Sequence, residues 1–141
     1  MNRTWLVLVG FIAVLLHSGV TWAVNCTAGL SASNPDTIYV DHGDGTVTDT
    51  RTGLMWKKCS EGQTWSSNTC SSDTDRAIHT WSAALDLASN STFAGYDNWR
   101  LPNRKELTSL TEECRSYPAI NDTLFPNTPN SYIWSASPYT A

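Results

Sequence analysis

Three carboxylates around a glycine-rich turn are the first side chains in this 141-residue chain that could do chemistry. Asp41, Asp44 and Asp49 carry oxygen atoms, which are the ligands that calcium prefers. A calcium loop supplies about six to eight oxygens and usually alternates its ligands along the chain, a pattern that these aspartates do not follow. We therefore favour hairpin chemistry, with Asp44 and Gly45 in one turn and Asp49 accepting backbone amides at the next. Calcium is kept as the weaker alternative, and no other metal and no cofactor is expected.

A second candidate site lies around Trp99. This side chain offers an aromatic face on which a sugar could stack, and Arg100 could form paired hydrogen bonds to an anion. Together with Arg104 and Lys105 they are the candidate ligand-binding residues, and the three cations could form a local basic patch. The structural alternative, which we favour, places Trp99 in the core and pairs Arg100 with a carboxylate such as Asp97.

The other reactive side chains form no catalytic constellation. His42 and His79 are far apart in the chain and have no cysteine or carboxylate partner at ligand spacing. No Gly-x-Ser-x-Gly motif is present. Glu112 and Glu113 are adjacent at the end of an expected helix, where neighbouring side chains point apart, so we expect solvated surface there. No enzymatic activity is predicted.

The four cysteines favour disulfides over a metal site. An even number in an exported chain is typical of paired cysteines, and four cysteines allow three pairings. We favour Cys59–Cys70, which closes a polar loop, and this leaves Cys26–Cys114. A structural zinc site usually needs two closely spaced cysteine pairs, and these spacings are too wide.

The start of the chain is typical of a cleavable signal peptide over residues 1–23. Arg3 is followed by an apolar run over residues 5–16 and a small residue, Ala23, after which we place the cut. The run is shorter than the roughly 20 residues that span a bilayer, so an uncleaved anchor is the weaker alternative. A lipoprotein is weaker still, because Val24 and Asn25 precede Cys26. We expect a periplasmic or extracellular protein with no membrane span after cleavage.

The mature chain, residues 24–141, has the length of one domain. We divide it into a polar lead-in over residues 24–36 and a domain over residues 37–141. Its 8 basic and 13 acidic residues give a formal charge of −5. Nucleic acid is therefore excluded as a partner, because phosphate binding needs clustered Lys and Arg.

Short β-rich runs and two helices are expected in this domain. Residues 37–40, 46–49 and 54–57 predict three short antiparallel strands, and residues 59–75 a loop. Trp81, Ala84, Leu85 and Ala88 form the apolar stripe of a first helix behind an N-cap at Thr80. Asn103 and Glu106 predict a capping box for a second helix, with Leu107 and Leu110 on its buried side. A last β-like run covers residues 132–135.

Four of these segments, taken in order, resemble the Lcl C-terminal domain family, named after a bacterial collagen-like adhesin. They are residues 43–49 with 52–56; Trp81 with Ala84 and Leu85; residues 94–103 running into Glu106 and Leu107; and residues 125–126 followed by 132–135. The resemblance extends from about Ile38 to the last residue. It implies an α+β domain of the C-type-lectin-like kind, related to the formylglycine-generating-enzyme fold, with short antiparallel strands and two helices and no catalytic residues.

The resemblance also implies a binding role and a shorter C-terminal end than in other family members. In the adhesin this domain is associated with sulfated glycosaminoglycans, a ligand that a charge of −5 disfavours here. Family members continue past the segment that matches residues 132–135, so we expect this chain to be incomplete at its C-terminal end. We expect a binding module that contacts a surface polysaccharide or an envelope protein. The alternatives are a structural envelope component, a truncated fragment without function, and an enzyme on the formylglycine-generating scaffold.

Overall fold

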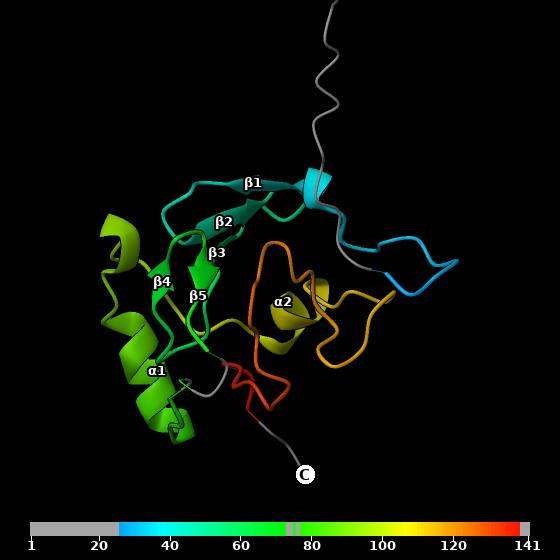
Figure 1. Cartoon of the computed structure of the whole chain (residues 1–141). Coiled ribbons are helices and arrows are strands. Elements are labelled where there is room, and N and C mark those ends of the chain that lie inside the picture. The colour runs from blue at the N-terminus through cyan, green and yellow to red at the C-terminus, as the bar shows by residue number, and fades with distance from the viewer. Residues whose placement is uncertain (1–25, 73–74, 76, 139–141) are drawn as a thin grey trace, which may run out of the picture.

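A three-stranded antiparallel sheet forms one end of the molecule (Figure 1). The computed structural model describes residues 26–72, 75 and 77–138, so the predicted signal peptide lies outside the described residues. The strands are β1 (Tyr39–Asp41), β2 (Thr46–Asp49) and β3 (Met55–Lys57), in the order β1-β2-β3. The three predicted strands are thus confirmed, with small shifts in their bounds. None of the helices in the described part of the chain is both long enough and apolar enough to cross a membrane.

The turn between β1 and β2 follows from its aspartate and glycine. Asp44 Oδ1 accepts hydrogen bonds from the amide and the hydroxyl of Thr46, at 2.9 and 2.6 Å. Gly43 and Gly45 have positive φ angles of 75° and 91°, which glycine adopts without steric cost. Gly45 is also buried, and the rings of Trp65 and Phe93 lie on the side where a Cβ would point.

Substitution of Gly45 by alanine should destabilise the domain by about 2 to 3 kcal/mol. A Cβ there would lie 2.9 Å from Phe93 and 2.9 Å from Trp65, so two aromatic rings would have to move. Gly43→Ala is the matched control, since its φ is also positive but nothing lies within 4 Å of the added Cβ. It should cost about 1 kcal/mol in urea unfolding. Equal losses for the two variants would contradict the packing described here.

The segment after Cys59 is more regular than the predicted loop. Within it a small hairpin forms from β4 (Trp65–Ser66) and β5 (Thr69–Cys70). Ser67 and Asn68 both have positive φ, the backbone that a tight two-residue hairpin turn requires. The expectation of a loop missed these two strands, because the sequence signal for this turn, Ser67-Asn68, is weaker than Asn-Gly or Asp-Gly. The Cys59–Cys70 disulfide closes the base of the hairpin, as predicted.

The two predicted helices are present. α1 (Trp81–Ser89) begins after Thr80, whose hydroxyl accepts a bond from the amide of Ala83. α2 (Arg104–Ser109) begins with the predicted capping box, in which Asn103 and Glu106 each accept a hydrogen bond from the other's backbone amide. The described residues also include two short 3-10 turns, η1 (Asp36–Ile38) and η3 (Phe93–Gly95).

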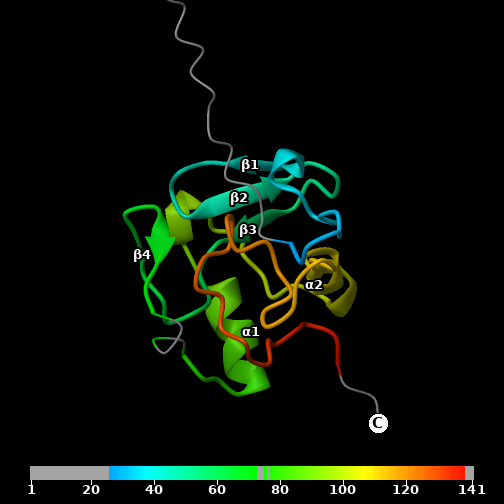
Figure 2. The same ribbon diagram turned by 45° about the vertical axis from the view of Figure 1, so that its right-hand side comes forward.

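The apolar stripe of α1 is only partly buried. Ala84 is buried and Leu85 and Ala88 are half-buried, whereas Trp81 is 40% exposed. The stripe is not fully covered because α1 lies at the opposite end of the molecule from the sheet (Figure 1 and Figure 2). The helix borders an open hollow instead of resting with its whole stripe on the core.

The apolar core is small and lies between the sheet and the second half of the chain. The ring of Tyr39 meets that of Phe125 edge-on, with 6.1 Å between centroids. Ile38, Trp56 and Ile120 pack around a buried cluster whose members are Tyr39, Val47, Leu110, Leu124 and Phe125. A core of this size supplies limited stability, so polar and covalent cross-links carry more of the fold.

The second disulfide, Cys26–Cys114, also forms as predicted, and it fastens the lead-in to the domain. The amide of Thr27 donates to the carbonyl of Cys114 at 2.9 Å. The described part of the polar lead-in therefore lies beside the loop that follows α2 (Figure 1). Residues 132–135, in contrast, form no strand, and the expectation of one there was wrong.

Candidate binding groove

An open hollow of about 1460 Å³ separates β3 from α1 and from the C-terminal segment. Its lining includes Trp56 of β3, Trp99 and Arg100 of the predicted block, and Trp134 near the end of the described chain. We call this hollow the groove. It brings together aromatic residues that are far apart in the sequence, which is a common feature of ligand sites.

One wall of the groove is a cluster of three aromatic rings. Trp99 meets Phe93 and Tyr96 edge-on, with 6.3 Å between centroids in each pair. The indole N–H of Trp99 donates to the carbonyl of Phe93 at 2.9 Å, which fixes the orientation of the ring. Trp99 is half-buried and lies outside the buried core cluster. It is therefore neither a core residue, as we expected, nor a fully exposed one.

Arg100 is paired, but not with the predicted partner. Its guanidinium donates to both carboxylate oxygens of Glu106, at 2.8 and 2.6 Å, whereas Asp97 makes no ion pair with any described residue. The hydrogen bonds from Arg100, aided by the Asn103 amide, lower the pKa of Glu106 to about 2. The same Glu106 therefore caps α2 and neutralises Arg100.

Acidification should weaken the domain through this carboxyl group. Because its folded pKa lies below the ordinary 4.5, its contribution is present above about pH 4.5 and is lost as pH falls towards about 2. Glu106→Gln should lower stability by up to about 1 kcal/mol at neutral pH, and the gap from the wild type should close on acidification. Asp97→Asn is the control and should change little. Thermal unfolding across this pH range measures the effect, and a gap that persists near pH 2 would contradict it.

The other two predicted ligand residues lie outside the groove. Arg104 and Lys105 are exposed on α2 and make no ion pair with any described residue. The backbone amide of Arg104 donates to Ser137 Oγ at 3.0 Å and so attaches the C-terminal segment to α2. The structure thus brings Trp99 and Arg100 to one site and leaves the other two cations on a separate surface.

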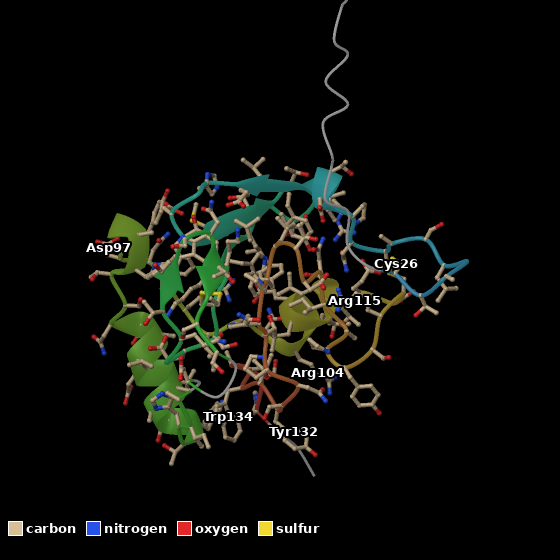
Figure 3. All side chains as sticks on the ribbon, in the orientation of Figure 1. Cys26, Asp97, Arg104, Arg115, Tyr132 and Trp134 are labelled. Atoms are coloured by element: carbon tan, nitrogen blue, oxygen red, sulfur yellow. A yellow bond between two sulfur atoms is a disulfide. The ribbon has the colours of Figure 1, made fainter. Side chains whose placement is uncertain are left out.

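The groove is also lined by residues 132–134, which lie in the segment predicted as a strand. Tyr132, Ile133 and Trp134 are 104%, 59% and 49% exposed. Figure 3 shows Tyr132 and Trp134 together at the end of the molecule opposite β1. The indole of Trp134 donates to the carbonyl of His79, and that of Trp81 to the carbonyl of Ser135, each at 2.8 Å. These two bonds hold the segment against the start of α1.

The aspartates considered for calcium have other partners. Asp41 forms an ion pair with Lys58 at 2.7 Å and accepts the Gly43 amide, while Asp44 accepts from Thr46. Asp49 accepts the amide of the residue two positions on at 2.8 Å, as the hairpin interpretation expects. Among the described residues, these aspartates do not come together as a group of metal ligands. Possible ligand atoms of Cys26, Cys114 and Glu112 do lie close together, but the two cysteines form a disulfide.

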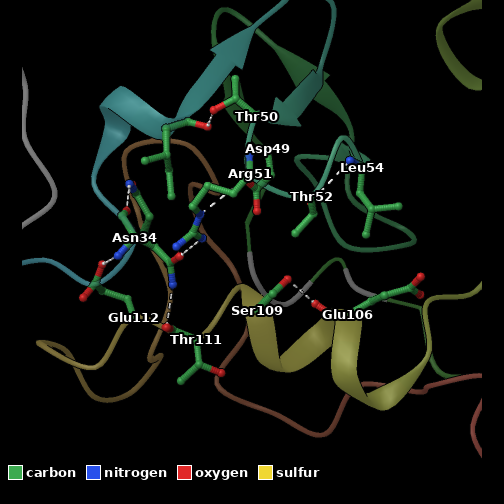
Figure 4. Close-up of polar contacts among 12 residues, drawn as sticks. Asn34, Asp49, Thr50, Arg51, Thr52, Leu54, Glu106, Ser109, Thr111 and Glu112 are labelled. Carbon is green, nitrogen blue, oxygen red and sulfur yellow. Dashed lines mark hydrogen bonds and ion pairs between the residues drawn. The ribbon is translucent and has the colours of Figure 1, made fainter.

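Glu112 contradicts the expectation of a solvated pair. It is fully buried, while Glu113 is exposed. One carboxylate oxygen accepts from the amide and hydroxyl of Ser33, at 2.8 and 2.9 Å, and the other from the amide of Asn34 at 2.8 Å. The amide of Cys114 also donates, at 3.1 Å. The carboxylate therefore anchors the lead-in, and Figure 4 shows its contact with Asn34.

A family model described as the Lcl C-terminal domain matches residues 45–141. The chain belongs to the Lcl C-terminal domain family. Within this Lcl C-terminal domain, the match begins inside the first hairpin, so β1 and the anchored lead-in lie before it. No curated protein matches the chain, and no solved structure does.

Proposed function

We propose that this member of the Lcl C-terminal domain family is an exported, non-catalytic binding module with a C-type-lectin-like fold. Its ligand is a surface polysaccharide or an envelope protein, and the groove is the binding site. Export to the periplasm or the cell exterior is consistent with two disulfides, which persist in oxidising compartments.

The observation that carries this proposal is the set of exposed aromatic side chains along the groove. Isolated exposed apolar residues are common on proteins, but a contiguous group of them marks an interaction surface. Tyr132 and Trp134 line the same hollow as the ring cluster of Trp99, and both are exposed. Aromatic rings bind sugars and peptides alike, so this surface suits either ligand class.

The charges at the groove favour binding over catalysis. Arg100 is held by Glu106, and Lys57 of β3 by Glu61 at 2.9 Å. A catalytic acid or base needs a pKa close to the working pH, whereas the pKa of Glu106 is about 2. Two of the charged groups that line the groove, Arg100 and Lys57, are thus paired with carboxylates, which supports a binding role.

Tyr132→Ala tests the proposed site with little risk to the fold. Its side chain is fully exposed, so the variant should keep wild-type stability while its affinity falls about tenfold, as for aromatic hot-spot residues. Leu30→Ala is the matched control, because Leu30 is 56% exposed and lies outside the groove. Binding would be measured first on a glycan array with the mature protein, and then by titration calorimetry with any glycan that binds. Equal affinity of both variants would place the ligand elsewhere, and an array without a hit at high protein concentration would count against a polysaccharide ligand.

A further inference from the structure

The hydrogen-bond pattern between β2 and β3 determines which backbone groups of β3 are free. In an antiparallel pair, residues that bond to the partner strand alternate with residues whose N–H and C=O point to the opposite side. The amide of Asp49 donates to Leu54 O, and that of Lys58 donates to Gly45 O, each at 2.9 Å. Counting from Leu54 towards Lys58, every second residue is therefore bonded to β2.

The free edge of β3 is formed by Met55 and Lys57. Trp56, between them, pairs with Val47 at a bonded position of the ladder. The N–H and C=O groups of its two neighbours consequently point away from β2, and no described residue forms a hydrogen bond to them there. An unpaired strand edge is a ready template for another strand.

This edge lies in the groove and not on open surface. All three residues of β3 are half-buried and line it. Backbone groups in such a position lose part of their access to water, so an occupant that bonds to them is favoured. An extended polypeptide offers N–H and C=O groups at the matching spacing, and a polysaccharide does not.

The charges along the edge also favour a polypeptide that is not strongly charged. Lys57 is neutralised by Glu61 and Lys58 by Asp41, at 2.9 and 2.7 Å. Lys57 additionally lies over the ring of Phe93, 5.0 Å from its centroid. The groove therefore offers apolar and aromatic surface with paired charges, which suits apolar side chains at alternate positions of a strand.

We infer that the groove binds an extended segment of a partner protein, which adds a strand to the sheet at the free edge of β3. Backbone hydrogen bonds to Met55 and Lys57 supply affinity, and alternate apolar side chains of the segment contact Trp99 and Trp134. This inference rests on the proposed function and names its ligand class.

Two substitutions at one position test the role of the backbone. A peptide selected on the mature protein from a phage-displayed random library serves as the probe. Lys57→Pro removes an amide that points away from β2, a position where an edge strand tolerates proline. Lys57→Ala removes the same side chain, with its ion pair, and keeps the amide. We expect the proline variant to bind at least about tenfold more weakly than the alanine variant, and equal binding would overturn the inference.

A second measurement uses the unaltered protein, so it does not depend on the folding of the proline variant. Copies of the selected peptide, each methylated at one backbone nitrogen, should lose binding at every second position. Loss at all positions or at none would contradict strand addition.

Three further outcomes separate this inference from the proposed function. Failure of the library to yield a binder, together with hits on the glycan array, overturns the inference and leaves the proposed function standing. Failure of both screens counts against both. Concentration-dependent dimerisation of the mature protein that Lys57→Pro abolishes would assign the edge to a second copy of the chain and overturn a separate partner.

Discussion

Replacement of Cys26 and Cys114 by alanine should lower the free energy of unfolding by about 4 to 5 kcal/mol. This disulfide joins residues 88 positions apart, so its removal releases a long loop in the unfolded chain. It also frees the lead-in, since the bond from Thr27 to the carbonyl of Cys114 lies next to it.

The disulfide of the hairpin provides the matched control. Cys59 and Cys70 are 11 positions apart, and the smaller loop corresponds to about 3 kcal/mol. Urea unfolding of both double-alanine variants under non-reducing conditions measures the difference. A larger loss from the shorter loop would show that the lead-in contributes little to the stability of the domain.

The substitution Glu112→Gln should cost about 3 to 4 kcal/mol. The carboxylate accepts four hydrogen bonds, and an amide would turn an NH2 group towards donors such as the Ser33 and Asn34 amides. Bonds to a buried charged group contribute about 1.5 to 3 kcal/mol each when one is removed, and donors left facing each other add to that loss. The exposed neighbour is the control, and Glu113→Gln should change stability by less than about 0.5 kcal/mol.

The pH dependence of the same variant gives an independent check. Burial alone would raise the pKa of Glu112, but the hydrogen bonds from Ser33, Asn34 and Cys114 outweigh it and hold the pKa below the ordinary value. The stabilisation by Glu112 is therefore present above about pH 4.5 and is lost as pH falls below it. The variant should lose less stability than the wild type on acidification. A parallel loss in both proteins would contradict the anchoring role.

The disulfide and the carboxylate hold the same segment, so their effects should not add. A double-mutant cycle between Glu112→Gln and the Cys26/Cys114 pair should show a coupling of at least about 1 kcal/mol. Full additivity would mean that the two anchors act independently.

The elements that could be predicted from the sequence are those with local signals. Asp44 and Gly45 specify their turn within a few residues, and Asn103 and Glu106 specify the start of α2. The even number of cysteines in an exported chain and the polar loop between Cys59 and Cys70 favoured that disulfide, and the other pair followed from it.

The features that could not be predicted depend on contacts between distant segments. Glu112 is buried because Ser33 and Asn34, 79 and 78 residues earlier in the chain, supply its hydrogen-bond donors. Arg100 bonds to Glu106 and not to Asp97, because the capping box already holds that glutamate near the start of α2. Neither arrangement could be predicted from the spacing of residue types in the sequence.

Only some of the residues that line the groove were predicted from the sequence. Trp99 and Arg100 were selected as a ligand platform because an aromatic and a cationic residue are adjacent. Tyr132 and Trp134 were assigned to a strand by their β-forming residue types. Their place in the groove depends on the hydrogen bonds that Trp134 and Trp81 form at the start of α1. The free edge of β3 became apparent only from the order of the strands in the sheet.

Ligand binding in the groove should be visible in the indole N–H signals of the mature protein. The tightest glycan or peptide from the two screens would be titrated into the labelled protein in two-dimensional NMR. Trp56, Trp99 and Trp134 line the groove, whereas Trp65 lies outside it, so the first three signals should shift and that of Trp65 should stay in place. A shift at Trp65 with none at Trp99 or Trp134 would show that the ligand does not bind in the groove.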